Sequence, residues 1–177
     1  MLFFRPSDRV ALSNASYIRD KGRLDDLASY RIVNSEPEVG FDDLILLARL
    51  ICKAPIATIT FVSDTKQWFK AVAGLDFCES SLEESICAHA ILQSDALVIK
   101  DLSRDSRTRD MRIVKKAPFV RFYAGVPLKT LGGHRIGTIC IMDKKPRQGL
   151  TLDETLSLEA LARQVVCQLL LRQTTHR

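Results

Sequence analysis

The chain has 177 residues, of which 46% are hydrophobic and 27% are charged, a balance that is typical of one globular domain and excludes a disordered chain. The longest apolar stretch, residues 44–51, is interrupted by Arg49 and is far shorter than the ~20 residues that a membrane span needs. No apolar leader segment opens the sequence. We therefore expect a cytoplasmic protein without a membrane partner.

Five cysteines are present without a CxxC pair, which is typical neither of a disulfide framework nor of a zinc ribbon. They predict reduced thiols and no metal site. The net charge is +5, and the excess is concentrated between Lys100 and Arg121, where basic residues outnumber acidic ones. Such a run is more often a solvated loop than a nucleic-acid surface, and no recognition helix or stacking aromatic motif accompanies it. Nucleic acid is therefore an unlikely partner and only a third alternative.

Helical periodicity dominates the first part of the chain. Residues 1–21 show no sustained period, so we expect an N-terminal arm there, a domain over 22–173 and a tail over 174–177. Leu24 and Leu27 predict a short helix over residues 23–30. A longer apolar stripe predicts a second helix over 41–53, which opens on acidic residues and stops before a proline.

The period then changes to that of strands. Residues 56–62 and 67–72 are rich in β-branched and aromatic side chains and are joined by a polar turn, which predicts a hairpin. A short helix over 83–92, a strand over 96–100 and a long polar loop ending near Pro118 follow. A second hairpin is predicted over 121–128 and 135–142, because Gly132 and Gly133 suit a tight turn.

The last helix is predicted to begin at a capping box, Thr151 to Glu154, and to run to about Gln173. Its apolar residues form a stripe that is wider than one sheet face covers, so a second copy of the chain is expected to cover the remainder. The stripe consists of Leu158, Leu161, Val165 and Leu169, widened by Leu156, Val166 and Leu170. The full order of elements lacks βαβ alternation, which favours an α+β fold with an antiparallel sheet.

Several short segments follow one another in a recognisable order: YRIVNSEPE at 30–38, FDDL at 41–44, PIA at 55–57, QWFK at 67–70, SICAHAI at 85–91, RFYAGVPL at 121–128 and GTIC at 137–140. Together they resemble bacterial GAF domains over roughly residues 23–172. The resemblance implies a GAF/PAS-like central antiparallel sheet of five to six strands. The N- and C-terminal helices would lie on one face, and a short helix and loops would cover the other.

The same resemblance implies a non-enzymatic signalling module. Such modules sense a small ligand or bind another protein, dimerise through the terminal helices, and act through a partner effector such as a histidine kinase or a cyclase. The sequence identifies neither the small molecule nor a cofactor.

Cys87 and His89 are the first candidates for the site, since a thiol and an imidazole can bind a metal or act as nucleophile and base. Residues two apart do not share a helix face, and two donors alone do not make a zinc site. In bilin-binding relatives a histidine directly follows the attachment cysteine, whereas Ala88 intervenes here. We expect a structural helix in which Cys87 is a small buried side chain and His89 bonds locally or lines the pocket.

Alternation along the strands supplies the other candidates. One of Trp68 and Phe69 is expected in the core, and Trp68 is taken as ligand-binding together with Tyr123. Thr138 and Cys140 point to the face opposite Ile139 and Ile141, so one pair should line the pocket.

Arg121 is the charged candidate at the mouth of the covering loop. Its guanidinium suits a ligand carboxylate or phosphate. The alternative, which the sequence leaves equally open, is a bond to Asp101, Asp105 or Asp110 of the loop itself.

The GAF resemblance also includes an enzymatic alternative, the free methionine-R-sulfoxide reductases, which use three cysteines at defined pocket positions. Cys78 and Cys87 fall near two of these positions. The catalytic cysteine is expected before Arg121, yet residues 102–120 contain none. Without the attacking thiolate the reductase is disfavoured.

Overall fold

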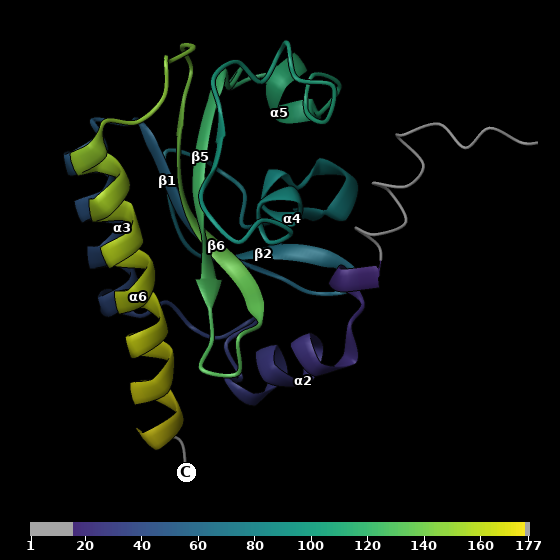
Figure 1. Cartoon of the computed structure of the whole chain (residues 1–177), viewed down its shortest axis with the longest axis vertical. Coiled ribbons are helices and arrows are strands. Elements are labelled where there is room, and N and C mark those ends of the chain that lie inside the picture. The colour runs from purple at the N-terminus through teal and green to yellow at the C-terminus, as the bar shows by residue number, and fades with distance from the viewer. Residues whose placement is uncertain (1–15, 176–177) are drawn as a thin grey trace, which may run out of the picture.

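A six-stranded antiparallel sheet with the strand order β3-β2-β1-β6-β5-β4 forms the centre of the computed structural model, which describes residues 16–175 (Figure 1). The pairing of β1 with β6 joins the two predicted hairpins, β1–β2 and β5–β6. The strands are β1 (Ile56–Val62), β2 (Lys66–Ala73), β3 (Glu79–Ser81), β4 (Leu97–Ile99), β5 (Phe122–Lys129) and β6 (Arg135–Asp143). The predicted α+β class and the number of strands are confirmed.

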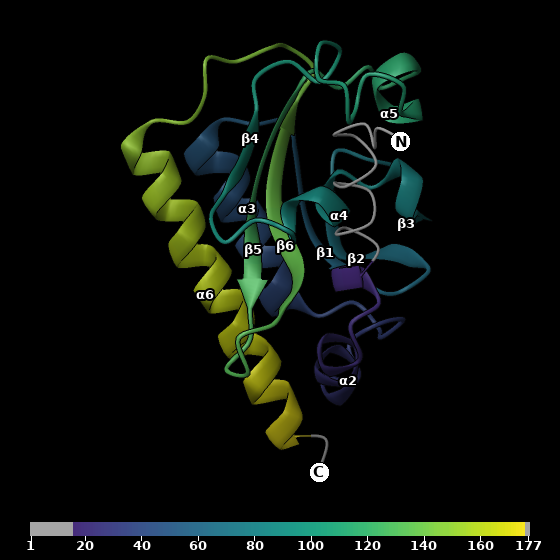
Figure 2. The same ribbon diagram turned by 45° about the vertical axis from the view of Figure 1, so that its right-hand side comes forward.

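Helices cover the two faces unequally. The long helices lie together on one face, whereas α4 and the loop that carries α5 lie on the other (Figures 1 and 2). The bounds are α2 (Lys21–Ser29), α3 (Val39–Cys52), the 3₁₀ turn η1 (Leu82–Glu84), α4 (Ile86–Ala90), α5 (Arg112–Lys115) and α6 (Leu152–Thr175). The capping box of α6 forms as predicted, since Glu154 N donates to Thr151 Oγ1 at 3.2 Å and Thr151 N donates to Glu154 Oε2 at 2.7 Å.

Strand alternation divides the interior into two apolar layers. On β5, Phe122 and Ala124 pack under α3 and α6, while Tyr123 faces α4. On β6, Ile139 and Ile141 likewise face the long helices and Cys140 faces α4. The sheet therefore separates a broad helix-side core from a smaller layer beneath α4.

The structure contains two short elements that the sequence did not predict. β3 is a three-residue edge strand that pairs with the start of β2. α5 is a single turn within the long polar loop, and its first residue, Arg112, donates its backbone N–H to the carboxylate of Glu84 at 2.6 Å. Elements this short carry no readable periodicity, which is why the pattern did not predict them.

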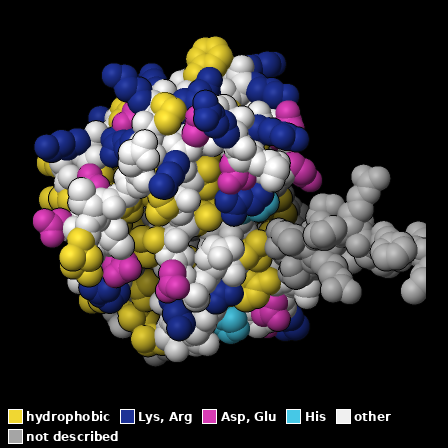
Figure 3. Space-filling model, turned by 45° about the horizontal axis from the view of Figure 1, so that its top comes forward, with side chains coloured by type: hydrophobic (Ala, Val, Ile, Leu, Met, Phe, Trp, Pro, Cys, Tyr) yellow, Lys and Arg dark blue, Asp and Glu magenta, His cyan; other side chains and the backbone are white. Residues whose placement is uncertain are grey.

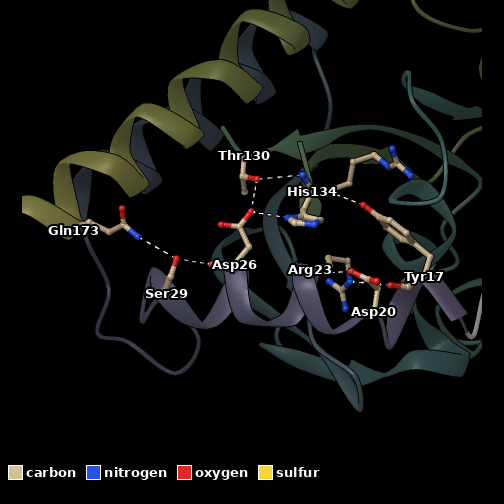
Figure 4. Close-up of polar contacts among 9 residues, drawn as sticks. Tyr17, Asp20, Arg23, Asp26, Ser29, Thr130, His134 and Gln173 are labelled. Carbon is tan, nitrogen blue, oxygen red and sulfur yellow. Dashed lines mark hydrogen bonds and ion pairs between the residues drawn. The ribbon is translucent and has the colours of Figure 1, made fainter. Parts of the chain in front are cut away.

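A polar corner joins α2, the β5–β6 turn and the end of α6 (Figure 4). The Asp26 carboxylate on α2 accepts a hydrogen bond from Thr130 Oγ1 and lies 3.0 Å from His134 Nδ1, both in or beside the turn. Gln173 Nε2 on α6 donates to Ser29 Oγ on α2 at 3.1 Å. Most of the expected N-terminal arm and the last two residues of the expected tail lie outside the described residues.

Most of the apolar stripe of α6 is buried within this chain. Leu158, Leu161, Val165 and Leu169 are all buried within the helix-side core, as is Val166. Large exposed apolar side chains occur instead on α3, at Leu46, Leu47 and Leu50, and at Leu152 and Leu156 on α6. No helix within residues 16–175 combines the length and the apolar character that a membrane span requires.

Candidate functional site

A small cavity lies between the sheet and α4. Its volume is about 20 Å³, and a single water needs roughly 10–15 Å³, so the space suits about one water molecule. The walls come from β1, β2, β5, β6, α4 and the covering loops: Thr58, Gln67, Phe69, Phe77, Glu84, Ile86, Cys87, Ile113, Tyr123 and Met142. Among the described residues, no lysine or arginine lines this cavity.

Tyr123 is placed in this layer by a glycine two residues further along β5. A Cβ atom at Gly125 would lie only 2.2 Å from the Tyr123 hydroxyl and 2.6 Å from Cζ, so the ring can lie along the strand only because Gly125 has no side chain. The buried Tyr123 hydroxyl then donates to Cys87 Sγ on α4 at 3.4 Å. This contact connects the sheet to its cover.

A buried row of polar side chains continues beneath Cys87. Thr58 Oγ1 lies 2.9 Å from Thr60 Oγ1 and 3.0 Å from Cys140 Sγ, which links β1 to β6. Thr138 lies against Cys87 and Tyr123, but its buried hydroxyl makes no hydrogen bond of normal geometry to a described residue. An unpaired buried hydroxyl is unusual in a folded core and is the kind of group that a ligand satisfies.

The two buried thiols of this row influence each other. The neighbouring Cys140 lowers the pKa of Cys87 to about 7, with smaller contributions from Thr138 and Tyr123, although burial acts in the opposite direction. Cys87 and burial raise the pKa of Cys140 well above its ordinary value. Burial, followed by the nearness of Cys87, raises the pKa of Tyr123. The hydrogen-bonded row therefore favours negative charge on Cys87 over its neighbours.

α4 is fastened to the sheet by a chain of side-chain hydrogen bonds. Ser85 Oγ accepts from Ala88 N at 2.9 Å and thereby caps the helix. The same hydroxyl donates to Gln67 Oε1 at 2.6 Å, and Gln67 Nε2 donates to Ser80 Oγ at 2.6 Å on β3. Strand alternation places Gln67 and Phe69 on the same face of β2, so it could have identified both as residues that line the cavity. Phe77 lies in a loop, where no alternation exists to identify it.

The structure brings four of the sequence-predicted site residues together: Cys87, Tyr123, Thr138 and Cys140. His89 lies on the same short helix but beside Asp105 and Arg107 of the covering loop, and burial together with Arg107 lowers its pKa. Trp68 lies apart from them, in the helix-side core, while Phe69 faces the cavity. Alternation permits either arrangement, and the larger helix-side core takes the larger ring.

Arg121 forms no ion pair with Asp101, Asp105 or Asp110 of the loop. Its Nη1 donates to the backbone carbonyls of Val114 at 2.9 Å and Val120 at 3.0 Å. The loop carboxylates pair instead with neighbours: Asp101 with Ser103 and Arg104, Asp105 with Arg107, and Asp110 with Lys115. Arg121 therefore fastens the covering loop. The sequence could not predict this role, because every residue has a backbone carbonyl and none is marked as the partner of Arg121.

Among the described side chains, no group of three or more His, Cys, Asp or Glu residues has the spacing that would hold a metal ion. All five cysteines are free; Cys78 and Cys167 are exposed, and Cys52, Cys87 and Cys140 are buried. The two thiols of the layer beneath α4, Cys87 and Cys140, thus lie next to hydroxyl groups and next to each other.

An antiparallel sheet with its long helices on one face and a polar pocket under a short helix on the other defines the class of α+β domain to which the chain belongs. The family model described as "GAF domain" matches residues 36–169. This match covers most of the chain, and the chain therefore belongs to the GAF domain family.

One curated relative is a cyclic di-GMP phosphodiesterase from Pseudomonas aeruginosa, 36% identical over 137 residues. The aligned region is 77% of this chain but 23% of the relative, so the chain spans about a quarter of that protein.

Solved structures of low sequence identity share the fold. The GAF domain of a phosphoenolpyruvate-protein phosphotransferase from Coxiella burnetii matches with a TM-score of 0.66 at 12% identity, covering 92% of this chain and 98% of that one. A free methionine-R-sulfoxide reductase from Neisseria meningitidis matches with a TM-score of 0.62 at 15% identity, covering 100% and 99%.

Proposed function

We propose that the chain is a non-enzymatic regulatory module that senses a small ligand between its sheet and α4 and passes the signal to an effector enzyme. The observation that carries the proposal is the buried row of hydroxyls and thiols, which contains an unpartnered Thr138 hydroxyl beside Cys87 and Tyr123. A core without a ligand role is normally filled by apolar side chains, because an unpaired buried hydroxyl is destabilising.

The lining chemistry supports a small, uncharged ligand. The polar groups that face the cavity are Thr58, Gln67, Cys87 and Tyr123, and the one carboxylate is that of Glu84. A phosphate group would have no cation to neutralise it there, because Arg121 is bonded to carbonyls of the covering loop. We therefore favour a neutral molecule with hydrogen-bonding groups over a nucleotide.

Ligand entry requires α4 to move. The cavity of about 20 Å³ is much smaller than the roughly 300–1,000 Å³ of typical ligand pockets. The polar contacts that hold the short helix against the sheet include those of Ser85 with Gln67 and of Tyr123 with Cys87. Exchanging these bonds for bonds to a ligand would couple occupancy of the site to the position of α4.

The curated relative supports an effector that acts on cyclic di-GMP, either on the same polypeptide or on a partner. A histidine kinase or a cyclase, the effectors that the sequence analysis expected, are the alternatives. A cytoplasmic location remains part of this proposal.

A homodimer is also part of the proposal, with α3 as its centre. Leu46, Leu47 and Leu50 on α3 are 51%, 46% and 65% exposed, and Leu156 on the adjacent α6 is 53% exposed. Exposed leucines gathered on one face mark a protein interface more often than a surface left in water. A second copy of the same layer would cover them.

Native mass spectrometry of the protein isolated from its own host tests the ligand proposal. We expect a co-purifying small molecule on the wild-type protein and its loss in Tyr123→Phe, which removes the hydroxyl facing the cavity. Tyr30→Phe is the matched control, because Tyr30 is equally buried but lies in the helix-side core. Empty wild-type protein, or equal occupancy in both variants, would contradict the proposal.

A methionine sulfoxide reductase activity is the enzymatic alternative, but residues 102–120, where the attacking cysteine is expected, contain no cysteine. Turnover of free methionine sulfoxide with a thiol reductant should be absent. Measurable turnover that is lost in Cys87→Ser would replace the sensory proposal with the enzymatic one.

A further inference from the structure

Basic side chains gather at the end of the sheet that carries α5 and the β6–α6 connection, away from the end of α6 (Figures 1 and 3). Two loops form this end and contact each other. Arg121 N donates to Asp143 O at 2.8 Å, and Arg147 N donates to Lys100 O at 3.1 Å. Residues 100–121 and 144–147 therefore make one continuous surface, which we call the basic end.

Only some of the cations at the basic end are neutralised by carboxylates. Asp101, Asp105 and Asp110 pair with neighbouring arginines and with Lys115. Other exposed cations have no carboxylate within ion-pair distance among the residues that the structure describes: Lys100, Arg112, Lys116, Lys144 and Lys145. The surface thus carries a positive potential that attracts an anionic partner.

An exposed phenylalanine stands among these cations. Phe119 is 51% exposed and has a φ of 57°, a left-handed conformation that is rare for a bulky residue. The loop holds it firmly, since Phe119 N donates to Lys116 O at 2.7 Å and Val120 N donates to Ile113 O at 2.9 Å. The Arg121 guanidinium bonds the carbonyl groups of Val114 and Val120 on either side of it.

We propose that the basic end docks on an anionic lipid surface, with Phe119 entering the interface between headgroups and acyl chains. Phe119 is preceded by Ala117 and Pro118, which have no polar side-chain groups, and these three residues lie next to Lys115 and Lys116. An apolar tip surrounded by lysines matches an anionic bilayer, where the ring leaves water and each cation adds about fivefold to the affinity.

A lipid surface fits better than nucleic acid. A nucleic-acid interface uses a helix that fits a groove or several aromatic rings along a basic channel. The basic end offers one turn of helix, α5, and one exposed aromatic ring. The proposal departs from the sequence-based expectation that a membrane is not a partner, and it is independent of the ligand site under α4.

Co-sedimentation of the full chain with vesicles tests the proposal. We expect binding to vesicles of phosphatidylcholine mixed with phosphatidylserine, little binding to phosphatidylcholine alone, and release by added salt. Phe119→Asn removes the ring while keeping a residue that tolerates a positive φ, and it should weaken binding roughly fivefold to tenfold. Lys116→Gln/Lys144→Gln should weaken it by more than about tenfold.

Two control variants change the opposite end of the molecule. Leu131→Asn removes a side chain that is 82% exposed in the β5–β6 turn, and Lys21→Gln/Lys129→Gln removes the same charge as the lysine pair. Both controls should bind vesicles as the wild type does. Equal binding by Phe119→Asn and wild type, or no binding to anionic vesicles, would overturn the proposal. Salt-sensitive binding to duplex DNA that needs the lysines but not Phe119 would replace it with a nucleic-acid surface.

Discussion

The buried threonines of the sheet differ in one respect, the pairing of their hydroxyl groups. Thr138 Oγ1 has no partner of normal geometry, whereas Thr58 Oγ1 bonds both Thr60 and Cys140. Replacing an unpaired hydroxyl with a methyl group of similar size removes a cost of about 1–3 kcal/mol, and deleting a paired one loses about 1 kcal/mol. Urea denaturation should therefore show that Thr138→Val raises the free energy of unfolding by about 1 kcal/mol and that Thr58→Val lowers it by about 1 kcal/mol. A destabilised Thr138→Val variant would mean that this hydroxyl is paired.

The cysteines provide a second measurement at the residue scale. The neighbouring groups of the buried row lower the pKa of Cys87 below the ordinary value of a thiol, which favours the reactive thiolate. Cys87 is only 4% exposed, however, and α4 seals it from reagents. Iodoacetamide should therefore modify the exposed Cys78 and Cys167 well before Cys87. Peptide mapping by mass spectrometry checks this order, and rapid modification of Cys87 would show that the cover opens readily.

Glu38 joins three elements at the start of α3. It accepts hydrogen bonds from Lys70 Nζ on β2 at 2.7 Å and from Arg172 Nε on α6 at 2.8 Å. Burial raises the pKa of Glu38, but the bonds from Lys70 and Arg172 outweigh burial and leave this pKa below its ordinary value. A lowered pKa means that the carboxylate stabilises the fold above its ordinary pKa and that this stability is lost as the pH falls through the lowered value.

Glu38→Gln should therefore reduce the free energy of unfolding by about 1–2 kcal/mol at neutral pH, because the fully buried side-chain nitrogen of Lys70 loses its anionic partner. The variant and the wild type should converge in stability as the pH falls below the ordinary carboxyl range. Denaturation curves across this range provide the check. An unchanged difference between the two proteins at low pH would contradict the assigned role.

The long elements are predictable from the sequence because each carries its own period. The helix-side stripe of α3 and the strand pattern of both hairpins predict those elements within a few residues. Periodicity states that a face is apolar but not what covers it: α3 and the sheet bury most of the α6 stripe, whereas Leu156 is exposed. For the same reason alternation placed Thr138 and Cys140 on one face but could not choose between Trp68 and Phe69.

At the scale of the whole molecule, the exposed leucines of α3 predict self-association. Leu50→Glu places a charge in the centre of the proposed interface and should turn a dimer into a monomer in sedimentation equilibrium, without loss of the folded domain. Leu131→Glu is the control, because Leu131 is more exposed but lies in the β5–β6 turn. A wild-type protein that is monomeric at high concentration would rule out this interface.

The central claim is that the polar layer beneath α4 is a ligand site that is closed when empty. A crystal structure of the protein isolated from its own host tests directly whether a ligand occupies this site. We expect electron density for a small neutral molecule between Tyr123 and α4, with the bond of Ser85 to Gln67 broken and α4 displaced. The same closed cavity of about 20 Å³, with Tyr123 still bonded to Cys87 in protein that regulates its effector, would contradict it.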